Sequence, residues 1–387
     1  MVRDMSILVI GAGIGGLAAA RALALRGADV TLLEQAEAIT EVGAGLQISP
    51  NGFAVLRALG LSEQVAARSV RARAVSLRDY RKSEVLRLDL TQQGGDGFLF
   101  VHRADLIDIL AEGARAAGVK IRLLQKVKEV DAGDRACVRL ANGDERHADL
   151  IVGADGLHSR VRPALCPTQE PFFTGQVAWR AIVPNFGNQP EEVRVYMGPH
   201  RHAVVYPLRD GSILNVVAVE ERDAWVEESW SQKDDPDSLR ESFAGFAPEL
   251  RAVLERVNEV NLWGLSRHEV APLWHSDGVA ILGDAAHPTL PFLAQGANLA
   301  LEDAWVLADA LERSGTVAEG LEAYQSRRRM RACRVIEAAN GNAWKYHLAF
   351  PPLRFAAHTA LRLGGMLAPM QILRKFDWLY NHDVTRG

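Results

Sequence analysis

The stretch SILVIGAGIGGLAAARALALRGADVTLLE, Ser6–Glu34, decides the fold of this chain. Ser6–Ile10 is a short apolar run, as expected of a parallel strand that is buried on both faces. A glycine-rich turn follows, then an alanine-rich helix that is predicted to end at Gly27, and then a second strand over Ala28–Leu33. This order of strand, turn, helix and strand predicts a βαβ unit of the Rossmann type.

Three glycines in the turn, Gly11, Gly13 and Gly16, have the spacing G-x-G-x-x-G. The first permits a tight turn, the second lets backbone approach a pyrophosphate, and the third lets the helix pack on the strand. The helix N-terminus presents unpaired N–H groups to the phosphates. Glu34, at the end of the second strand, is placed to accept a hydrogen bond from a ribose hydroxyl, which favours a free 2′-hydroxyl over a 2′-phosphate. Together these features predict a bound dinucleotide, either NAD or FAD.

The same stretch also has features of a secretory signal. Arg3 precedes the apolar run, and small residues follow around Ala18–Ala20. Four glycines within the run, Asp4 before it and the complete βαβ unit favour the dinucleotide site instead.

The composition limits the class of protein. At 387 residues the chain has room for two domains, or for one large domain with an insertion. The net charge of −4 comes from both signs without a long block, so neither nucleic acid nor an anionic membrane is expected as a partner. No run of 18 apolar residues occurs: Phe355–Met370 is interrupted by His358 and Arg362 and is expected to be a packed helix.

The three cysteines, Cys137, Cys166 and Cys333, are far apart in the sequence. They predict no metal site and no disulfide framework, which suits a reducing cytoplasm, and we expect a cytoplasmic protein. The oligomeric state stays open between a monomer and a homodimer, because the C-terminal helices could cover a pocket or form a dimer surface.

The predicted secondary structure changes along the chain. Lys120–Val130 is predicted to be a strand, whereas the region from Phe172 to about Trp263 shows short strands, an acidic helix near Asp223–Trp230 and a helical stretch over Pro236–Val257. We therefore expect a discontinuous nucleotide-binding domain formed by 1–70, 98–172 and 265–335, a second domain formed by 71–97 and 173–264, and a C-terminal helical segment over 336–387.

Two further junctions between a buried strand and a loop carry chemistry: GADGLHSRVR at 153–162 and GDAAHPTLPFLAQGANLALEDA at 283–304. At the carboxyl edge of a parallel sheet, an acid after glycine can meet a sugar or ribityl hydroxyl. The helix that begins near Gly296 directs its N-terminus at a negative group. Each Gly-Asp pair alone is more often a turn. The two pairs together, in this order after the first motif, are specific for a dinucleotide-binding protein.

With these motifs the chain resembles the single-component FAD-dependent aromatic hydroxylases, the group A flavoprotein monooxygenases. The resemblance covers nearly the whole length and includes GAGIGG with Glu34, Arg103 before its helix, and the two junctions. It looks closest to the salicylate hydroxylase and 3-hydroxybenzoate 6-hydroxylase branch. That placement depends on GAGLQISPN at 43–51, His202-x-x-x-Tyr206, Pro291-x-x-x-Gln295 and the terminal FDWLYNHD.

The resemblance implies an α/β fold: a Rossmann-like FAD-binding domain with an inserted, mainly antiparallel β-sheet substrate domain and C-terminal helices. It also implies residues for the ADP half of FAD. Arg103 would contact the phosphates or the ribityl chain. The other residues implied for this half are Gly11, Gly13, Gly16, Glu34 and, near the adenosine, Gln125.

For the flavin half, the resemblance implies that Asp284 binds the ribityl hydroxyls and that Asp155 serves both FAD and NAD(P)H. The backbone of Gly296, Ala297 and Asn298 would lie against the pyrimidine edge of the isoalloxazine, where N–H groups and the helix dipole stabilise the anionic reduced flavin. The chain has no second dinucleotide motif, so NADH or NADPH is expected to bind transiently against the same flavin. The sequence does not determine whether the electron donor is NADH or NADPH.

Three residues are the candidates for catalysis. His202 and Tyr206 share one face of a strand, because side chains alternate along it. The resemblance implies hydroxylation by a flavin C4a-hydroperoxide, an electrophilic attack that is faster on a phenolate than on a phenol. A His–Tyr pair suits that proton transfer, and Gln295 could bind the phenol or a carboxylate. The alternative is that Tyr206-Pro207 only caps a strand and that His202 is exposed at the hairpin over 198–201.

Other charged residues have competing interpretations. His287 is expected to be a structural hydrogen-bonding residue. Arg180 could hold a carboxylate, guide the nicotinamide, or form an exposed salt bridge. The arginines of 327–334 are expected to form a solvated helix face.

The expected function is that of a monooxygenase that uses NAD(P)H and O2 to hydroxylate a small phenolic aromatic acid. The same flavin chemistry on an N-heteroaromatic or non-carboxylated ring, or an epoxidation of alkenes, stays open. A non-catalytic flavin-binding regulator is the alternative outside enzymes.

Overall fold

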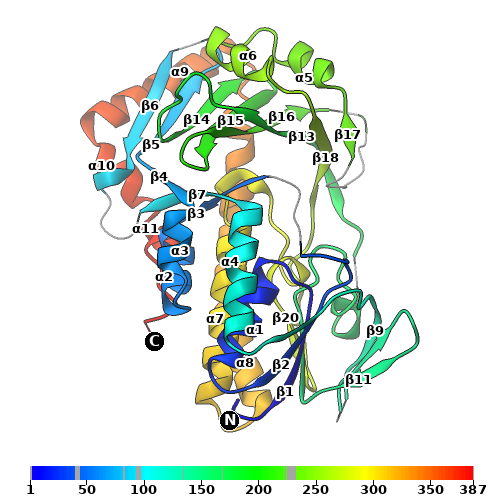
Figure 1. The fold of residues 1–387 in the computed structure, drawn as a ribbon. Helices are drawn as coiled ribbons and strands as arrows, with labels where there is room; N and C mark the ends of the chain where they lie inside the picture. Colours follow the sequence, from blue (N-terminus) through cyan, green and yellow to red (C-terminus); the bar gives the residue numbers. More distant parts are fainter. Residues whose placement is uncertain are drawn as a thin grey trace.

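Two large sheets, one below the other in Figure 1, organise the computed structural model. It describes the whole chain except residues 1, 40–43, 82, 93–96, 134, 168, 223, 225–231 and 387, and the side chains of 92, 342 and 343. The predicted acidic helix near Asp223–Trp230 and Gly43 of the GAGLQISPN motif therefore lie outside the described residues.

The lower sheet has six strands in the order β19-β20-β12-β1-β2-β8. All its pairs are parallel except that of β19 with β20. Its central strand β1 is buried beyond Ser6, which explains the unbroken apolar sequence. The strands are β1 (Ser6–Ile10), β2 (Asp29–Leu33), β8 (Lys120–Arg122), β12 (Leu150–Gly153), β19 (His275–Ser276) and β20 (Val279–Ile281).

Helix α1 (Ile14–Ala24) lies against this sheet and contacts α4 (Arg103–Ala116) and α7 (Gly296–Arg313), and α8 (Val317–Asn342) packs on α7 (Figure 1). The glycines and alanines of α1 let α7 approach closely, since a Cβ on Gly15 would lie 3.3 Å from the Cβ of Ala300 on α7. Helix α1 ends before the predicted Gly27, which forms a left-handed turn with φ +91°.

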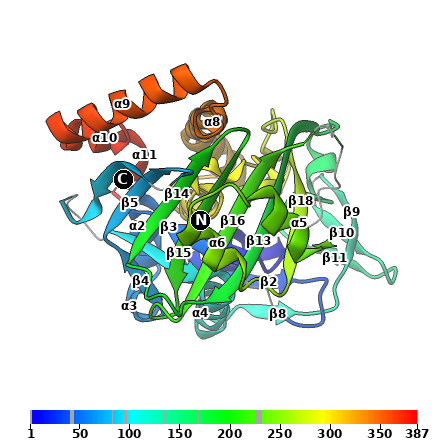
Figure 2. The same ribbon diagram turned by 90° about the horizontal axis from the view of Figure 1, so that it is seen from above.

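The upper sheet has eight strands in the order β17-β18-β13-β16-β15-β14-β5-β6, and only β14 and β5 are parallel. Helices α5 and α6 cover one face of it, as Figure 2 shows from above. The strands and helices are β5 (Ala74–Asp79), β6 (Glu84–Asp89), β13 (Phe172–Pro184), β14 (Glu192–Gly198), β15 (Arg201–Leu208), β16 (Ile213–Glu221), β17 (Lys233–Asp234), β18 (Val260–Arg267), α5 (Pro236–Ser242) and α6 (Pro248–Leu254).

Strands from 71–97 and from 173–264 share this upper sheet, while the domain boundaries themselves stay a prediction. The helical stretch predicted over Pro236–Val257 is two helices, because the chain turns after Ser242 and restarts at Pro248, a residue suited to a helix's first position.

Two three-stranded sheets complete the β structure. The stretch predicted as one strand over Lys120–Val130 is two strands in different sheets, because Leu124 turns the chain with φ +58°. The remaining elements are β3 (Gly45–Ile48), β4 (Ser69–Ala72) and β7 (Phe98–His102) in one sheet, β9 (Val127–Asp131), β10 (Cys137–Leu140) and β11 (Glu145–His147) in the other, and helices α2 (Pro50–Ala58) and α3 (Ser62–Ala67).

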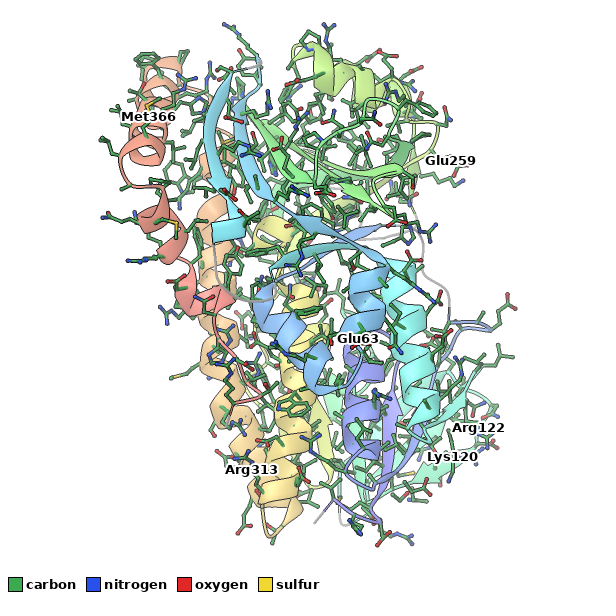
Figure 3. All side chains as sticks on the ribbon, turned by 60° about the vertical axis from the view of Figure 1, so that its left-hand side comes forward. Glu63, Lys120, Arg122, Glu259, Arg313 and Met366 are labelled. Atoms are coloured by element: carbon green, nitrogen blue, oxygen red, sulfur yellow. The ribbon has the colours of Figure 1, made fainter. Side chains whose placement is uncertain are left out.

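The C-terminal helices are in red at the left of Figure 1: α9 (Pro351–Leu367) lies beside β6, α10 (Pro369–Arg374) packs on α9, and α11 (Asp377–Tyr380) contacts α2. The expectation of a fully packed α9 is wrong for one face, where Phe355, Met366 and Leu367 are 71%, 78% and 82% exposed. Figure 3 shows Met366 at the outer side of this helix. Among the described residues, no helix has the length and apolarity needed to cross a membrane.

Candidate active site

A cavity of about 690 Å³ lies between the two large sheets. The N-termini of α1 and α7 meet there with the cavity face of the upper sheet. The structure thus brings residues predicted for the cofactor together with those predicted for the substrate. The predicted residues that line the cavity are Gly13, Arg103, His202, Tyr206, Asp284, Gln295, Gly296 and Ala297.

The three glycines of the first motif differ in what surrounds them. Gly11 has φ +101°, and a Cβ there would lie 2.6 Å from the carbonyl oxygen of Ala154. A Cβ on Gly16 would lie 2.0 Å from the carbonyl oxygen of Gly11. Around Gly13, by contrast, a Cβ would meet no atom within 4 Å, and the backbone is extended. The protein's own packing therefore requires Gly11 and Gly16, whereas Gly13 leaves a space that fits a pyrophosphate against the N-terminus of α1.

Glu34 lies beside this turn with its carboxylate oriented by backbone. Oε2 accepts a hydrogen bond from the amide of Ala12 at 2.8 Å, and Oε1 accepts one from Ala36 at 2.9 Å. The amide of Gln125 donates to the Glu34 carbonyl at 2.8 Å, which places Gln125 next to it but outside the cavity lining. Arg122 precedes Gln125 at this outer edge of the sheet (Figure 3). This arrangement fits a ribose between the glycine turn and the end of β2.

The N-terminus of α7 forms another part of the cavity wall. Ala294 is left-handed, with φ +52°, and turns the chain so that Gly296 and Ala297 face the cavity. The side chain of Asn298 instead binds β3: it accepts from the amide of Ser49 at 3.1 Å and donates to the carbonyl of Gln47 at 3.0 Å. These bonds fix the helix start, whose backbone dipole is directed at the cavity.

Two predicted acids have different surroundings. Asp284 is exposed and lines the cavity at the end of β20. Asp155 turns its carboxylate into its own loop, where it accepts hydrogen bonds from the Ser159 hydroxyl and the Arg160 amide, both at 2.6 Å. Burial raises the pKa of Asp155, although these hydrogen bonds oppose the increase. Asp155 thus shapes the loop, and its predicted contacts with FAD and NAD(P)H stay a prediction.

The side chain of Gln295 is buried, and both ends of its amide have protein partners. Nε2 donates to the hydroxyl of Ser49 at 3.0 Å, and Oε1 accepts from Nδ2 of Asn51 at 3.1 Å. The same Asn51 nitrogen donates to Glu302 on α7 at 2.6 Å. The network connects the loop before α7 to the N-terminus of α2, so a substrate contact of Gln295 stays a prediction.

Strand β15 separates two faces, as the alternation predicts. His202, Val204 and Tyr206 line the cavity, whereas Ala203 and Val205 pack into the core beneath α5 and α6. The alternative that His202 is exposed at the hairpin is wrong.

The ring of His202 is only 3% exposed. Its Nδ1 lies 2.6 Å from Nε2 of His347, and the ring of Tyr346 lies 5.2 Å away, centroid to centroid. Burial lowers the pKa of His202 well below its usual value, and the nearby His347 lowers it further. At neutral pH His202 is therefore uncharged, so one of its ring nitrogens has a lone pair that can accept a hydrogen bond.

Tyr206 has the opposite character. Burial raises the pKa of its phenol, and Arg180 and Asn215 oppose that effect only in part. Tyr206 therefore stays protonated and is a hydrogen-bond donor, with its ring 5.0 Å from that of Phe100. Arg180, which also lines the cavity, places its guanidinium 4.2 Å above the Trp263 ring and supplies positive charge on this side.

The expectation of a solvated arginine face on α8 is wrong for two of its residues. Arg328 and Arg331 have side chains that are 1% and 9% exposed, and both pair with Glu302 of α7. Arg328 also pairs with Asp303, which pairs in turn with His287. The reason is the packing of α8 on α7, which directs arginines at buried carboxylates. His287 is thus a structural partner of Asp303, as expected.

Residues that the sequence did not identify also stand out. His347 and Glu221 continue the hydrogen bonds from His202, although 145 and 126 residues separate the paired positions, and no local pattern could reveal them. On the β10–β11 hairpin, Cys137, Glu145 and His147 have ligand atoms within 4.8 Å of one another. There Arg139 already pairs with Glu145.

Known proteins resemble this chain over most of its length. A family model described as an FAD binding domain matches residues 4–339. The 3-amino-4-hydroxybenzoate 2-monooxygenase of Streptomyces cremeus is 36% identical over 90% of both chains. The 3-hydroxybenzoate 6-hydroxylase of Klebsiella oxytoca is 33% identical over 98% of this chain and 97% of that protein. The 6-hydroxynicotinate 3-monooxygenase of Bordetella bronchiseptica is 34% identical over 87% and 91%.

A solved structure agrees with the fold across the whole chain. A variant of HpxO from Klebsiella pneumoniae, complexed with FAD, has a TM-score of 0.86 and 25% identity and covers 98% of this chain and 99% of that one. HpxO has also been solved with FAD and uric acid, at a TM-score of 0.83, with 26% identity and 94% of each chain covered.

Proposed function

The chain belongs to the group A FAD-dependent aromatic hydroxylases, and from this premise we propose that it uses NAD(P)H and O2 to hydroxylate a small phenolic acid of the salicylate or hydroxybenzoate kind. The proposal depends mainly on two side chains of β15 that line the cavity. His202 is an uncharged hydrogen-bond acceptor, and Tyr206 is a protonated donor. A ring hydroxyl that must lose a proton is the group that such a pair can recognise.

FAD fits the residues that surround the cavity. The glycine turn with the N-terminus of α1 would hold the pyrophosphate, Glu34 would hold the ribose, and Arg103 and Asp284 would hold the chain that leads to the flavin. The backbone at Gly296 would face the flavin ring. When bound, FAD takes electrons from NAD(P)H and supplies the reactive oxygen that comes from O2.

The protein's own side chains would then position and activate the ring. His202 would accept the proton of the ring hydroxyl, and Tyr206 would donate a hydrogen bond to an oxygen of the substrate. The positive charge of Arg180 would attract the carboxylate. The apolar side chains of β14 and β15 would surround the ring and exclude water, which strengthens these polar interactions.

The named substrates of the relatives support this class. Of the three curated relatives named above, two act on a hydroxybenzoate or an amino-hydroxybenzoate, and the names of all three substrates describe a ring with a hydroxyl group and a carboxylate. A second candidate is an N-heteroaromatic or non-carboxylated ring, which 6-hydroxynicotinate 3-monooxygenase and the uric acid complex of HpxO favour. A non-catalytic flavin-binding regulator is the remaining alternative.

The test begins with the visible spectrum of the purified protein. NADH, and separately NADPH, is then added with salicylate, 3-hydroxybenzoate, 6-hydroxynicotinate or urate, and both NAD(P)H loss and hydroxylated product are measured. We expect a phenolic acid to stimulate oxidation and to be hydroxylated. Stimulation only by 6-hydroxynicotinate or urate would favour the second candidate, and flavin bands without any stimulation would contradict the proposal.

A further inference from the structure

Three hydrogen bonds lead from the cavity to the surface of the protein. Nδ1 of His202 lies 2.6 Å from Nε2 of His347, and Nδ1 of His347 lies 2.8 Å from Oε1 of Glu221. The other carboxylate oxygen of Glu221 lies 2.7 Å from Nδ1 of His200. His202 and His347 are buried, whereas the side chain of His200 is 58% exposed. The chain of contacts therefore begins at the substrate wall and ends in water.

Glu221 determines which nitrogens carry hydrogen. Burial favours its protonated form, but the hydrogen bonds from His200 and His347 outweigh that effect and lower the pKa of Glu221. An ionised carboxylate only accepts hydrogen bonds, so Nδ1 of His347 must carry the hydrogen. Burial lowers the pKa of His347, against the opposing effect of Glu221. His347 is thus neutral, and its Nε2 is an acceptor.

The same reasoning applies to His202. Because Nε2 of His347 accepts, Nδ1 of His202 must donate to it. The neutral ring of His202 then has its lone pair on Nε2. The carboxylate of Glu221 therefore sets the tautomer of a ring that it does not touch, and it prepares His202 as a base in the wall of the cavity.

We propose that His347 and Glu221 form a proton relay that carries the proton of the substrate's ring hydroxyl from His202 to solvent, and that His200 holds the Glu221 carboxylate at the surface. This inference depends on the proposed function for the origin of the proton. His202 touches the substrate in this scheme, and the other three residues act through it.

Each proton transfer in the relay breaks one bond and forms one. The substrate O–H breaks, and its proton binds Nε2 of His202. The Nδ1 proton of His202 moves to Nε2 of His347, and the Nδ1 proton of His347 moves to Glu221. Glu221, whose side chain is 37% exposed, passes the proton to water, while Nδ1–H of His200 stays hydrogen-bonded to its other oxygen. Afterwards the substrate is a phenolate. Once the ring is hydroxylated, Glu221 takes a proton from water and the transfers run in reverse, which protonates the ring oxygen of the product and restores the original tautomers.

The charges around these hydrogen bonds disfavour a proton that stays on either imidazole. Arg201 of β15 and His200 lower the pKa of His347, and Tyr346 packs its ring against His202. Neither buried imidazole holds a positive charge at neutral pH, so a proton that enters passes on to Glu221 and the surface.

The test compares the FAD-loaded wild type with His347→Gln, whose amide can still accept from His202 but cannot transfer a proton. With 3-hydroxybenzoate and the other phenolic acids of the panel as probes, we expect the hydroxylation rate of the variant to fall about tenfold to a hundredfold, with an unchanged KM. In His347→Gly, added imidazole should restore most of the rate. His275→Gln, which alters a second His–Glu pair far from the cavity, is the matched control. Unchanged hydroxylation in His347→Gln would overturn the relay.

A measurement without substrate tests the hydrogen bonds themselves. In ¹⁵N-histidine-labelled, FAD-loaded protein, NMR should show hydrogen on Nδ1 of both His202 and His347, and Glu221→Gln should change that pattern. An Nε2–H tautomer of His202 would overturn the relay. If no phenolic acid stimulates the wild type, the proposed function fails, and the NMR result still decides whether the relay chain exists.

Discussion

Oε1 of Gln295 accepts a hydrogen bond from Nδ2 of Asn51 at 3.1 Å, across 244 residues of sequence. Both residues are buried, at 2% and 1% exposed, so water cannot replace either partner. The bond holds the loop before α7 against the N-terminus of α2. Gln295 thus shapes the cavity-lining loop before α7, and the substrate contact of Gln295 stays a prediction.

We expect Gln295→Ala to weaken both folding and FAD binding. The change removes the hydrogen bonds that Gln295 makes with Asn51 and Ser49. Their loss should lower the free energy of unfolding by about 1 to 3 kcal/mol. Urea unfolding of the apoprotein and FAD titration by flavin fluorescence measure the two effects. A raised KM for the substrate with unchanged stability would instead support the substrate contact.

Gly13→Ala should separate cofactor binding from folding. The backbone there is extended and a Cβ would meet no protein atom within 4 Å, so the apoprotein should unfold at the same urea concentration as the wild type. A bound pyrophosphate would meet that methyl group, and we expect the Kd for FAD to rise at least about tenfold, or 1.4 kcal/mol.

Gly245→Ala is the matched control for this change, because a Cβ on this exposed glycine also meets no protein atom within 4 Å. It should leave FAD affinity unchanged. Equal FAD affinity in Gly13→Ala and the wild type would contradict the assignment of the glycine turn to the pyrophosphate.

Tyr206→Phe should slow hydroxylation and divert NAD(P)H oxidation to hydrogen peroxide. The substitution removes a hydrogen-bond donor from the cavity wall but keeps the ring that packs against Phe100. We expect the rate to fall about tenfold while FAD binding and the melting temperature stay close to the wild type. Product and peroxide are measured per NADH consumed. Unchanged coupling would remove Tyr206 from the mechanism.

Asp303→Asn should destabilise the protein by about 3 to 5 kcal/mol, because it removes the ionic partner of buried His287 and leaves Arg328 with Glu302 alone. Chemical denaturation at neutral pH measures the loss. Glu312→Gln, which changes an exposed ion pair with Arg26, should cost far less. A loss as small as that of the control would show that the buried network contributes little.

The same pair predicts how wild-type stability changes with pH. Burial alone would raise the pKa of Asp303, but His287 and Arg328 outweigh it and lower the pKa to about 2. Its contribution is therefore present above pH 3.8 and disappears as the pH falls through 2. Burial would lower the pKa of His287, but Asp303 outweighs burial and raises it. That contribution is present below pH 6.5 and disappears as the pH rises through the raised pKa. Unfolding free energies that do not decline at either end would contradict this.

Much of the fold followed from local patterns. The spacing of Gly11, Gly13 and Gly16 between two apolar strands depends only on neighbours in the chain, as does the alternation along β15 that places His202 and Tyr206 on one face. Errors arose where packing decides the outcome. Arg328 has the same residue type as its exposed neighbours on α8, yet it is buried because α7 presents two carboxylates to it.

The sequence by itself therefore determined the glycine turn, the family and several of the residues that line the cavity, because each depends on residues that are close together in the chain. Only the tertiary structure decided that Gln295 is held by Asn51, that Asp155 turns into its own loop, and that His202 connects through His347 to Glu221. The physical reason is that a hydrogen bond is directional and acts over about 3 Å. Its partner comes from whichever strand or helix the fold brings to that place, and no local pattern in this chain records which one that is.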